Sequence, residues 1–219
     1  MSQLKLTADG GGGTVAIKGP ASTTGNAALE MTVPSTTSDT LDSLKRSGNI
    51  LQVVKTNVTA TSSYGTSAAT HYTLTPLNTT VTPVGTNSHY IISAQVSGEG
   101  TASNQQYFLR LVRNTTSGFA DGDNVAIAIG DNGSNNTAPE NTSAFHGYAL
   151  ENNDSTISTA HISSYVDSPS VSAGGNLQYK VQLFMQTGTT WYMNRTKTEY
   201  NATYGDYLPS WITVMEVAA

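Results

Sequence analysis

Apolar and polar residues alternate along most of the chain, and clusters of Gly, Asn, Asp, Ser and Pro interrupt the alternation. Residues 211–217, for example, read Trp-Ile-Thr-Val-Met-Glu-Val. A period of two is typical of strands that bury one face, and the clusters between them are typical of turns. The pattern predicts strands at residues 50–56, 71–76, 89–96, 106–112, 125–129, 144–150, 157–166, 177–186, 190–193 and 211–217.

These segments predict an all-β fold, because no convincing amphipathic helix lies between them. Many short strands separated by turns favour an antiparallel β-sandwich, and a jelly roll is its most plausible form. We expect residues 49–219 to form this jelly-roll-like head domain. The polar segment 35–48, which is rich in Thr, Ser and Asp, is predicted to be a linker.

Residues 1–34 are predicted to be a small β module. Two alternating segments flank the glycines at 10–13, which suit a turn because glycine tolerates positive φ, and a third segment covers 26–33. Three short strands have too few apolar side chains for a core of their own, so the module needs a partner surface. The larger apolar side chains available for that contact are Leu4, Leu6, Val15, Ile17, Leu29 and Met31.

The composition argues against several classes of partner. Charged residues make up 11% of the chain, against roughly 25% in an ordinary soluble domain. With 10 scattered basic residues and a net charge of −5, neither nucleic acid nor a membrane surface is an expected partner. The absence of Cys excludes disulfides and thiolate metal sites. No apolar run resembles a signal peptide, so we expect the protein to be made in a cytoplasm.

Candidate metal ligands fall into two groups. Asp121, Asp123 and Asp131 lie in acidic segments whose oxygen atoms suit calcium. Asp and Asn also dominate turns by bonding their own backbone, and the calcium-loop pattern is absent, so turn chemistry is the favoured interpretation. We therefore expect no cofactor and no essential metal. The histidines lack the spacing of clustered ligands and are expected to be half-exposed strand residues: His71, His89, His146 and His161.

No catalytic motif stands out. The sequence has no Gly-x-Ser-x-Gly elbow, no phosphate loop and no dinucleotide fingerprint, so we expect a non-enzymatic protein. Paired carboxylates for glycoside hydrolysis stay open, since sequence does not show which acids meet in space. Aromatic residues crowd the end of the chain, where they could stack on sugars or pack a core or subunit interface. We favour packing for Trp191, Tyr192, Tyr200, Tyr204, Tyr207 and Trp211.

Several stretches resemble one family. Residues 4–20 read LKLTADGGGGTVAIKGP, and GNAALEM follows at 25–31. In order come 48–54, 108–113, 126–131, 166–169, 179–182, 192–195 and the ending VMEVAA at 214–219. On these stretches the chain resembles structural and fibre-type virion proteins of marine cyanophages and related tailed phages. The resemblance implies a virion surface protein, commonly a homotrimer, with a jelly-roll-like head and no catalytic residues to transfer.

The size of the chain orders the candidate functions. Long tail fibres carry a shaft before the head, and no shaft is seen, so the favoured prediction is a trimeric capsid decoration or knob protein on the virion surface. The alternative is a short tail-fibre or appendage tip that binds host-surface glycans, and a depolymerising enzyme is a third class. The expected partners are further copies of the chain and other virion proteins. Residues 1–34 are predicted to be the virion-attachment module.

Overall fold

The structure, a computed structural model, describes residues 3–7, 14–18, 47–65, 70–101, 106–128, 146–149, 157–185, 188–197 and 206–219. The chain divides into two compact units, residues 1–44 and residues 45–219, and the division falls within the predicted linker. In the first unit β1 (Gln3–Thr7) pairs antiparallel with β2 (Thr14–Lys18). The third predicted strand, at 26–33, lies outside the described residues, as does most of the linker.

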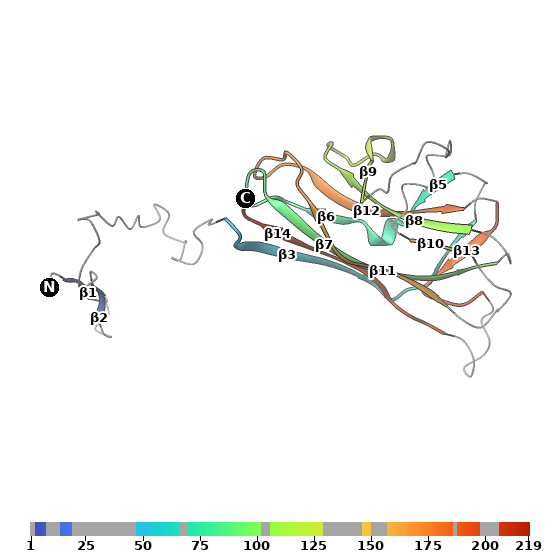
Figure 1. Ribbon diagram of the computed structural model, residues 1–219, viewed down its shortest axis with the longest axis horizontal. Helices are drawn as coiled ribbons and strands as arrows, with labels where there is room; N and C mark the ends of the chain where they lie inside the picture. Colours follow the sequence, from blue (N-terminus) through green and yellow to red (C-terminus); the bar gives the residue numbers. More distant parts are fainter. Residues whose placement is uncertain are drawn as a thin grey trace. The chain divides into compact units, whose positions relative to one another are not determined.

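The second unit, which we call the head, contains two antiparallel sheets (Figure 1). At the centre of the first sheet, β7 (His89–Gly100) has β11 (Ser158–Asp167) along one side. Along the other side of β7, β14 (Ser210–Val217) and β13 (Thr190–Met193) lie end to end, each paired with a different part of β7. Their outer neighbours are β3 (Ile50–Val58) and β4 (Ser62–Gly65).

The second sheet is built in the same way around β12 (Leu177–Met185) and β8 (Gln106–Asn114). Along the outer side of β12, β5 (Thr70–Thr73) and β6 (Thr79–Val81) follow one another. Along the outer side of β8 lie β9 (Val125–Ile127) and β10 (His146–Ala149). Each sheet therefore has four strand positions among the described residues. We call these positions columns, and some of them hold two strands placed end to end.

The order of these columns defines the fold. Each of the pairs β3 with β4, β5 with β6, β9 with β10, and β13 with β14 forms one interrupted column. Numbered along the chain, the first sheet then reads 1-8-3-6 and the second 2-7-4-5. The chain crosses between the sheets and returns its last column beside its first, which is the double Greek key of a jelly roll. The predicted all-β sandwich is confirmed.

One predicted strand ends early. The prediction at 71–76 stops at Thr73, and the 3₁₀ turn η3 (Thr75–Leu77) follows. Pro76 has no N–H to donate to a sheet, so it suits the first turn of a helix better than a paired strand. Leu74 and Leu77 on either side of it are fully buried. The turn therefore inserts its apolar side chains into the core instead of extending the sheet.

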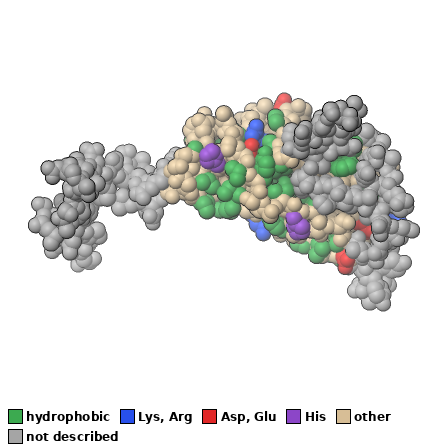
Figure 2. Space-filling model, viewed as in Figure 1, with side chains coloured by type: hydrophobic (Ala, Val, Ile, Leu, Met, Phe, Trp, Pro, Cys, Tyr) green, Lys and Arg blue, Asp and Glu red, His purple; other side chains and the backbone are tan. Residues whose placement is uncertain are grey.

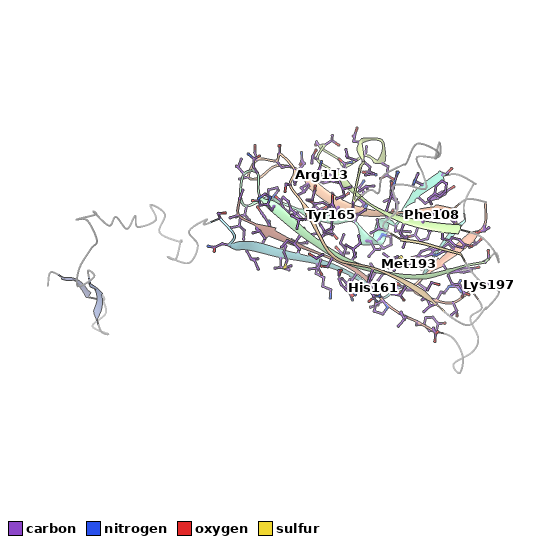
Figure 3. All side chains as sticks on the ribbon, in the orientation of Figure 1. Phe108, Arg113, His161, Tyr165, Met193 and Lys197 are labelled. Carbon is purple, nitrogen blue, oxygen red and sulfur yellow. The ribbon has the colours of Figure 1, made fainter. Side chains whose placement is uncertain are left out.

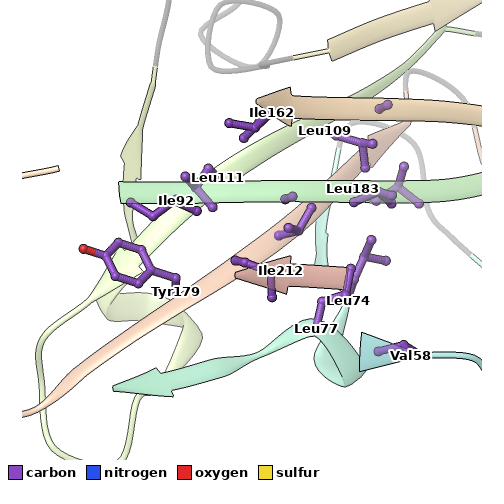
Figure 4. Close-up of a cluster of buried hydrophobic side chains, with 14 of the residues drawn as sticks. Val58, Leu74, Leu77, Ile92, Leu109, Leu111, Ile162, Tyr179, Leu183 and Ile212 are labelled. Carbon is purple, nitrogen blue, oxygen red and sulfur yellow. The ribbon is translucent and has the colours of Figure 1, made fainter. Parts of the chain in front are cut away.

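Inward-facing side chains from both sheets form one core (Figure 4). Ile92 and Ile212 come from the first sheet, and Leu111 and Leu183 come from the second. Trp191 is the largest fully buried side chain, and its ring lies 6.1 Å from that of Tyr64. The alternation that predicted the strands is thus the alternation between this core and the outer faces.

A partly buried ion pair links the two sheets. Arg113 on β8, labelled in Figure 3, donates from Nη1 to Oδ1 of Asp167 at 2.6 Å. The hydroxyl of Tyr179 on β12 donates to the other carboxylate oxygen at 2.8 Å. Because Asp167 belongs to β11 of the first sheet, its carboxylate accepts both bonds from across the sandwich.

A single asparagine holds the two interrupted columns of the first sheet together. Asn194 is buried and has a φ of 63°, a left-handed conformation that asparagine adopts more readily than most residues. Its side-chain amide donates to the carbonyl oxygens of Val58 and Ala60, at 2.8 and 2.9 Å. Its side-chain oxygen accepts a 2.6 Å bond from the Ser210 hydroxyl. The breaks between β3 and β4 and between β13 and β14 therefore meet at one residue.

Candidate functional site

Four of the predicted attachment residues occupy one face of the β1–β2 hairpin. The register places Leu4 opposite Ile17 and Leu6 opposite Val15. Directly opposed residues of an antiparallel pair share a face, and so do residues two apart in one strand. The ladder therefore has one face that is apolar at every position.

The other face of the hairpin is mixed. It pairs polar residues with one alanine: Gln3 with Lys18, Lys5 with Ala16, and Thr7 with Thr14. The remaining predicted attachment residues, Leu29 and Met31, lie outside the described residues.

The outer face of the first sheet carries apolar residues across all four columns. Ile91 on β7 pairs with Val166 on β11 and, on its other side, with Met215 on β14, which pairs with Val53 on β3. Val53 and Val166 are each 57% exposed, while Ile91 and Met215 are half-buried. We call these four residues the apolar row. Ile50, which is 62% exposed, lies near its β3 end.

Charge is scarce around the apolar row. At the outward positions of β3, β14, β11 and residues 89–95 of β7, the one formally charged side chain is Lys55, which lies 5.4 Å from the ring centroid of Trp211. Hydrophobic side chains gather on the face that Figure 2 shows, where Figure 1 draws β7 and β14. The other outward residues there are mostly uncharged and polar, among them Asn57, Ser93, Gln95 and Thr213, with His89 and His161.

The second sheet is covered along β12. Every residue of β12 is buried, including the polar Gln178, Lys180 and Gln182. The segment between β8 and β9 lies over this strand, where the Lys180 ammonium donates to the Phe119 carbonyl at 2.6 Å and to Asp121 at 2.9 Å. The two faces of the sandwich therefore differ: the β12 positions are covered, and the apolar row is open.

The acidic segment after β8 has the contacts of a turn. Burial raises the pKa of Asp121, but hydrogen bonds from Lys180 and Thr73 outweigh it, so that pKa lies below its ordinary value. Asp123 accepts a 2.9 Å bond from a neighbouring threonine hydroxyl. Both carboxylates thus have side-chain partners within the protein. Asp131 lies outside the described residues.

The head begins and ends at the same end of the sandwich. The Gly48 N–H donates to the Ala218 carbonyl, and the Ala218 N–H donates to the Asn49 carbonyl, both at 2.9 Å. The apolar row lies near this end, because Val53 and Met215 are only a few residues from those contacts. Gly48 and Asn49, at the start of the described part of the head, therefore lie close to the row.

A buried carboxylate fixes a loop at this end. Glu216 is fully buried and accepts bonds from the Gln52 amide and from the backbone N–H groups of Val84, at 2.9 Å, and Gly85, at 2.7 Å. Burial raises the pKa of Glu216, but these donors lower it by more, so the net pKa lies below the ordinary value. We assign this residue a structural role, since its contacts tie the loop between β6 and β7 to β14.

The aromatic residues near the end of the chain separate into distinct environments. Trp191 is buried, which confirms core packing for that residue. Tyr192 stacks against the Arg195 guanidinium at 3.8 Å, and Trp211 lies on the outer face of the first sheet. Tyr207 is 57% exposed. The two remaining members of the predicted set, Tyr200 and Tyr204, lie outside the described residues.

The histidines lie at separate strand positions. His89 and His161 are exposed on β7 and β11, and His161 is labelled in Figure 3. His71 is half-buried, with its ring 4.9 Å from that of Phe184, and His146 begins β10. Within the described ranges, no three His, Asp or Glu side chains gather as metal ligands would. No helix of the described residues is long and apolar enough to span a membrane.

Comparison with known proteins gives structural matches only. No family model matches the chain, and no curated protein matches its sequence. The structure of Eiger TNF from S. frugiperda has 8% identity and a TM-score of 0.36, covering 79% of this chain and 94% of that one. The structure of infectious bursal disease virus, Gx strain, has 13% identity and a TM-score of 0.38, covering 99% of this chain and 46% of that one. At these TM-scores neither carries an argument, so the fold assignment rests on strand pairing.

Proposed function

We propose that this protein is a structural protein exposed on the surface of a bacteriophage particle, where N-terminal units hold a trimer of jelly-roll heads. The apolar face of the β1–β2 hairpin carries this proposal. A two-stranded hairpin is marginal in water on its own, so a face made of Leu4, Leu6, Val15 and Ile17 calls for a partner surface. The resemblance of residues 4–20 and 214–219 to tailed-phage virion proteins supports the same role.

Within this role we propose a capsid decoration, or cement-like, protein. The alternative, a fibre tip that binds host glycans, needs open aromatic rings for sugars to stack on. Trp191 is buried, and Tyr192 and Trp211 lie against the cationic side chains of Arg195 and Lys55. Most of the described aromatic residues near the end of the chain therefore have protein partners already. The proposed role requires no catalytic step.

The number of copies in each particle tests this function. Densitometry of purified particles of the encoding phage should give a band of the same order of intensity as the major capsid protein, because decoration follows the symmetry of the capsid lattice. A trace band would instead support the fibre-tip alternative. Absence of the protein from purified particles would reject the virion role. Incubation of the protein with host polysaccharide, followed by assay for new reducing ends, tests the depolymerase class separately.

A further inference from the structure

We infer that the apolar row is the surface on which a second copy of this chain packs. The inference rests on the proposed trimer and names the face that forms it. The row crosses the sheet from Val166 through Ile91 and Met215 to Val53, with exposed residues at both ends and half-buried residues between them. Each member lies next to an inward-facing apolar residue of the same strand, so the row is additional to the core residues.

Charge favours another copy as the occupant. The chain has a net charge of −5, so copies that met through acidic surfaces would repel one another. No carboxylate occupies the outward positions around the row, and the one cation there, Lys55, already lies against the Trp211 ring. Depletion of charged residues is the compositional mark of the centre of a protein interface. This face can therefore meet its own copy without burying carboxylates, and Lys55 is the one cation that it carries.

The area of this face can be compared with the area that a stable protein interface buries. Four strands of about seven residues each span about 20 Å by about 24 Å, which is a flat area of roughly 480 Å². A stable interface buries about 600–1,000 Å² on each partner. The flat area of the face is therefore at least about half of what a stable interface buries on each partner.

The position of the row links assembly to attachment. The first residues of the head lie at the same end as the row, beside the carbonyl of Ala218. In copies that meet through the row, Gly48 and Asn49 of each head therefore lie near the interface. Three hairpin faces in one trimer bind a particle with avidity, since the second and third contacts form within one complex.

Three valines of almost equal exposure provide a matched test on the full-length protein. Val53→Glu with Val166→Glu changes both ends of the row, and Val125→Glu on β9 changes a residue that is 52% exposed on the other sheet. Sedimentation equilibrium should give three times the 23.0 kDa chain mass for the wild type and for Val125→Glu. The double variant should sediment as a monomer, with the dissociation constant raised at least about 100-fold, because unpaired charges oppose burial.

Far-ultraviolet circular dichroism shows whether the variants fold. A second, milder variant, Val53→Ser with Val166→Ser, should also weaken assembly. If the wild type is a dimer and the double variant is a monomer, the row is still the interface but the protein is not a trimer. A wild-type trimer that both pairs leave intact would overturn the inference about the row but keep the trimer. A monomeric wild type at micromolar concentration would overturn both.

Discussion

Replacement of Gly98 by Ala should lower the free energy of unfolding of the head by about 3 kcal/mol, the upper part of the usual range for overpacking. A Cβ atom at Gly98 would lie 1.9 Å from Cζ2 of Trp191, whose ring is buried. Gly100→Ala should act in the same way, because its Cβ atom would lie 1.9 Å from the hydroxyl oxygen of Tyr107. Both rings are fully buried, so neither can move aside without disturbing the core.

A urea titration of the full-length protein at one fixed protein concentration measures this loss of unfolding free energy. Gly65→Ala is the control, because a Cβ atom there would meet nothing within 4 Å, and its effect should stay within about 0.5 kcal/mol. Trp191→Phe should partly relieve Gly98→Ala, so the double variant should be more stable than the sum of the single effects implies. Additive effects, or a loss at Gly98 no larger than at Gly65, would contradict the packing of Trp191 over β7.

The second large effect is expected at the partly buried ion pair. Asp167→Ala should destabilise the head by about 3 kcal/mol, because removal of one partner of a buried pair leaves the other uncompensated. Arg113 would lose its carboxylate, and the buried Tyr179 hydroxyl would lose its acceptor. We place the loss at the lower end of the range for buried pairs, since the Arg113 side chain is 22% exposed and water can reach it.

A double-mutant cycle separates this coupling from the general cost of substitution. Tyr179→Phe removes only the hydroxyl donor, and its effect should nearly vanish in the Asp167→Ala background. Asp123→Ala is the matched acidic control, because Asp123 is exposed and should change stability by about 0.5 kcal/mol or less. A cost for Asp167→Ala below about 1 kcal/mol would show that the ion pair contributes little across the sandwich.

Much of the jelly roll could be predicted because burial follows sequence with a period of two. Residues 211–217 alternate between outer face and core along almost all of β14. The prediction at 89–96 fell short of the end of β7, because Ser97-Gly98-Glu99-Gly100 has the composition of a turn. Glycine continues the strand there to leave room for Trp191 and Tyr107, which are distant in sequence. Contacts of that kind have no local signal.

The apolar row was missed, although a signal for it is present. Each of its strands contains two consecutive apolar residues: Val53 with Val54, Ile91 with Ile92, Tyr165 with Val166, and Val214 with Met215. One residue of each pair points to the core, so its neighbour must be on the outer face. Only the strand register shows that the four outer residues are aligned. The ion-pair partners of Lys180 and Asp167 had no comparable signal, since both pairs span many residues.

The hairpin shows how far pattern alone can reach. Alternation correctly predicts the two strands, and it places Leu4 and Leu6 on one face of the first and Val15 and Ile17 on one face of the second. The pairing register decides whether both pairs of residues lie on the same side of the hairpin. The glycines between the strands do not fix that register. The partner surface is not encoded in the chain, so the attachment role must be tested on particles.

The central claim is that the N-terminal unit attaches the head to the virion, and co-sedimentation with particles that lack this protein tests it most directly. Full-length protein should pellet with the particles. Residues 45–219 alone should fold but stay in the supernatant, as should the full chain with Leu6→Asp and Ile17→Asp. The control pair Thr7→Asp and Ala16→Asp has the same diagonal placement on the other hairpin face and should still pellet. If residues 45–219 pellet as well as the full chain, attachment lies in the head and the claim is wrong.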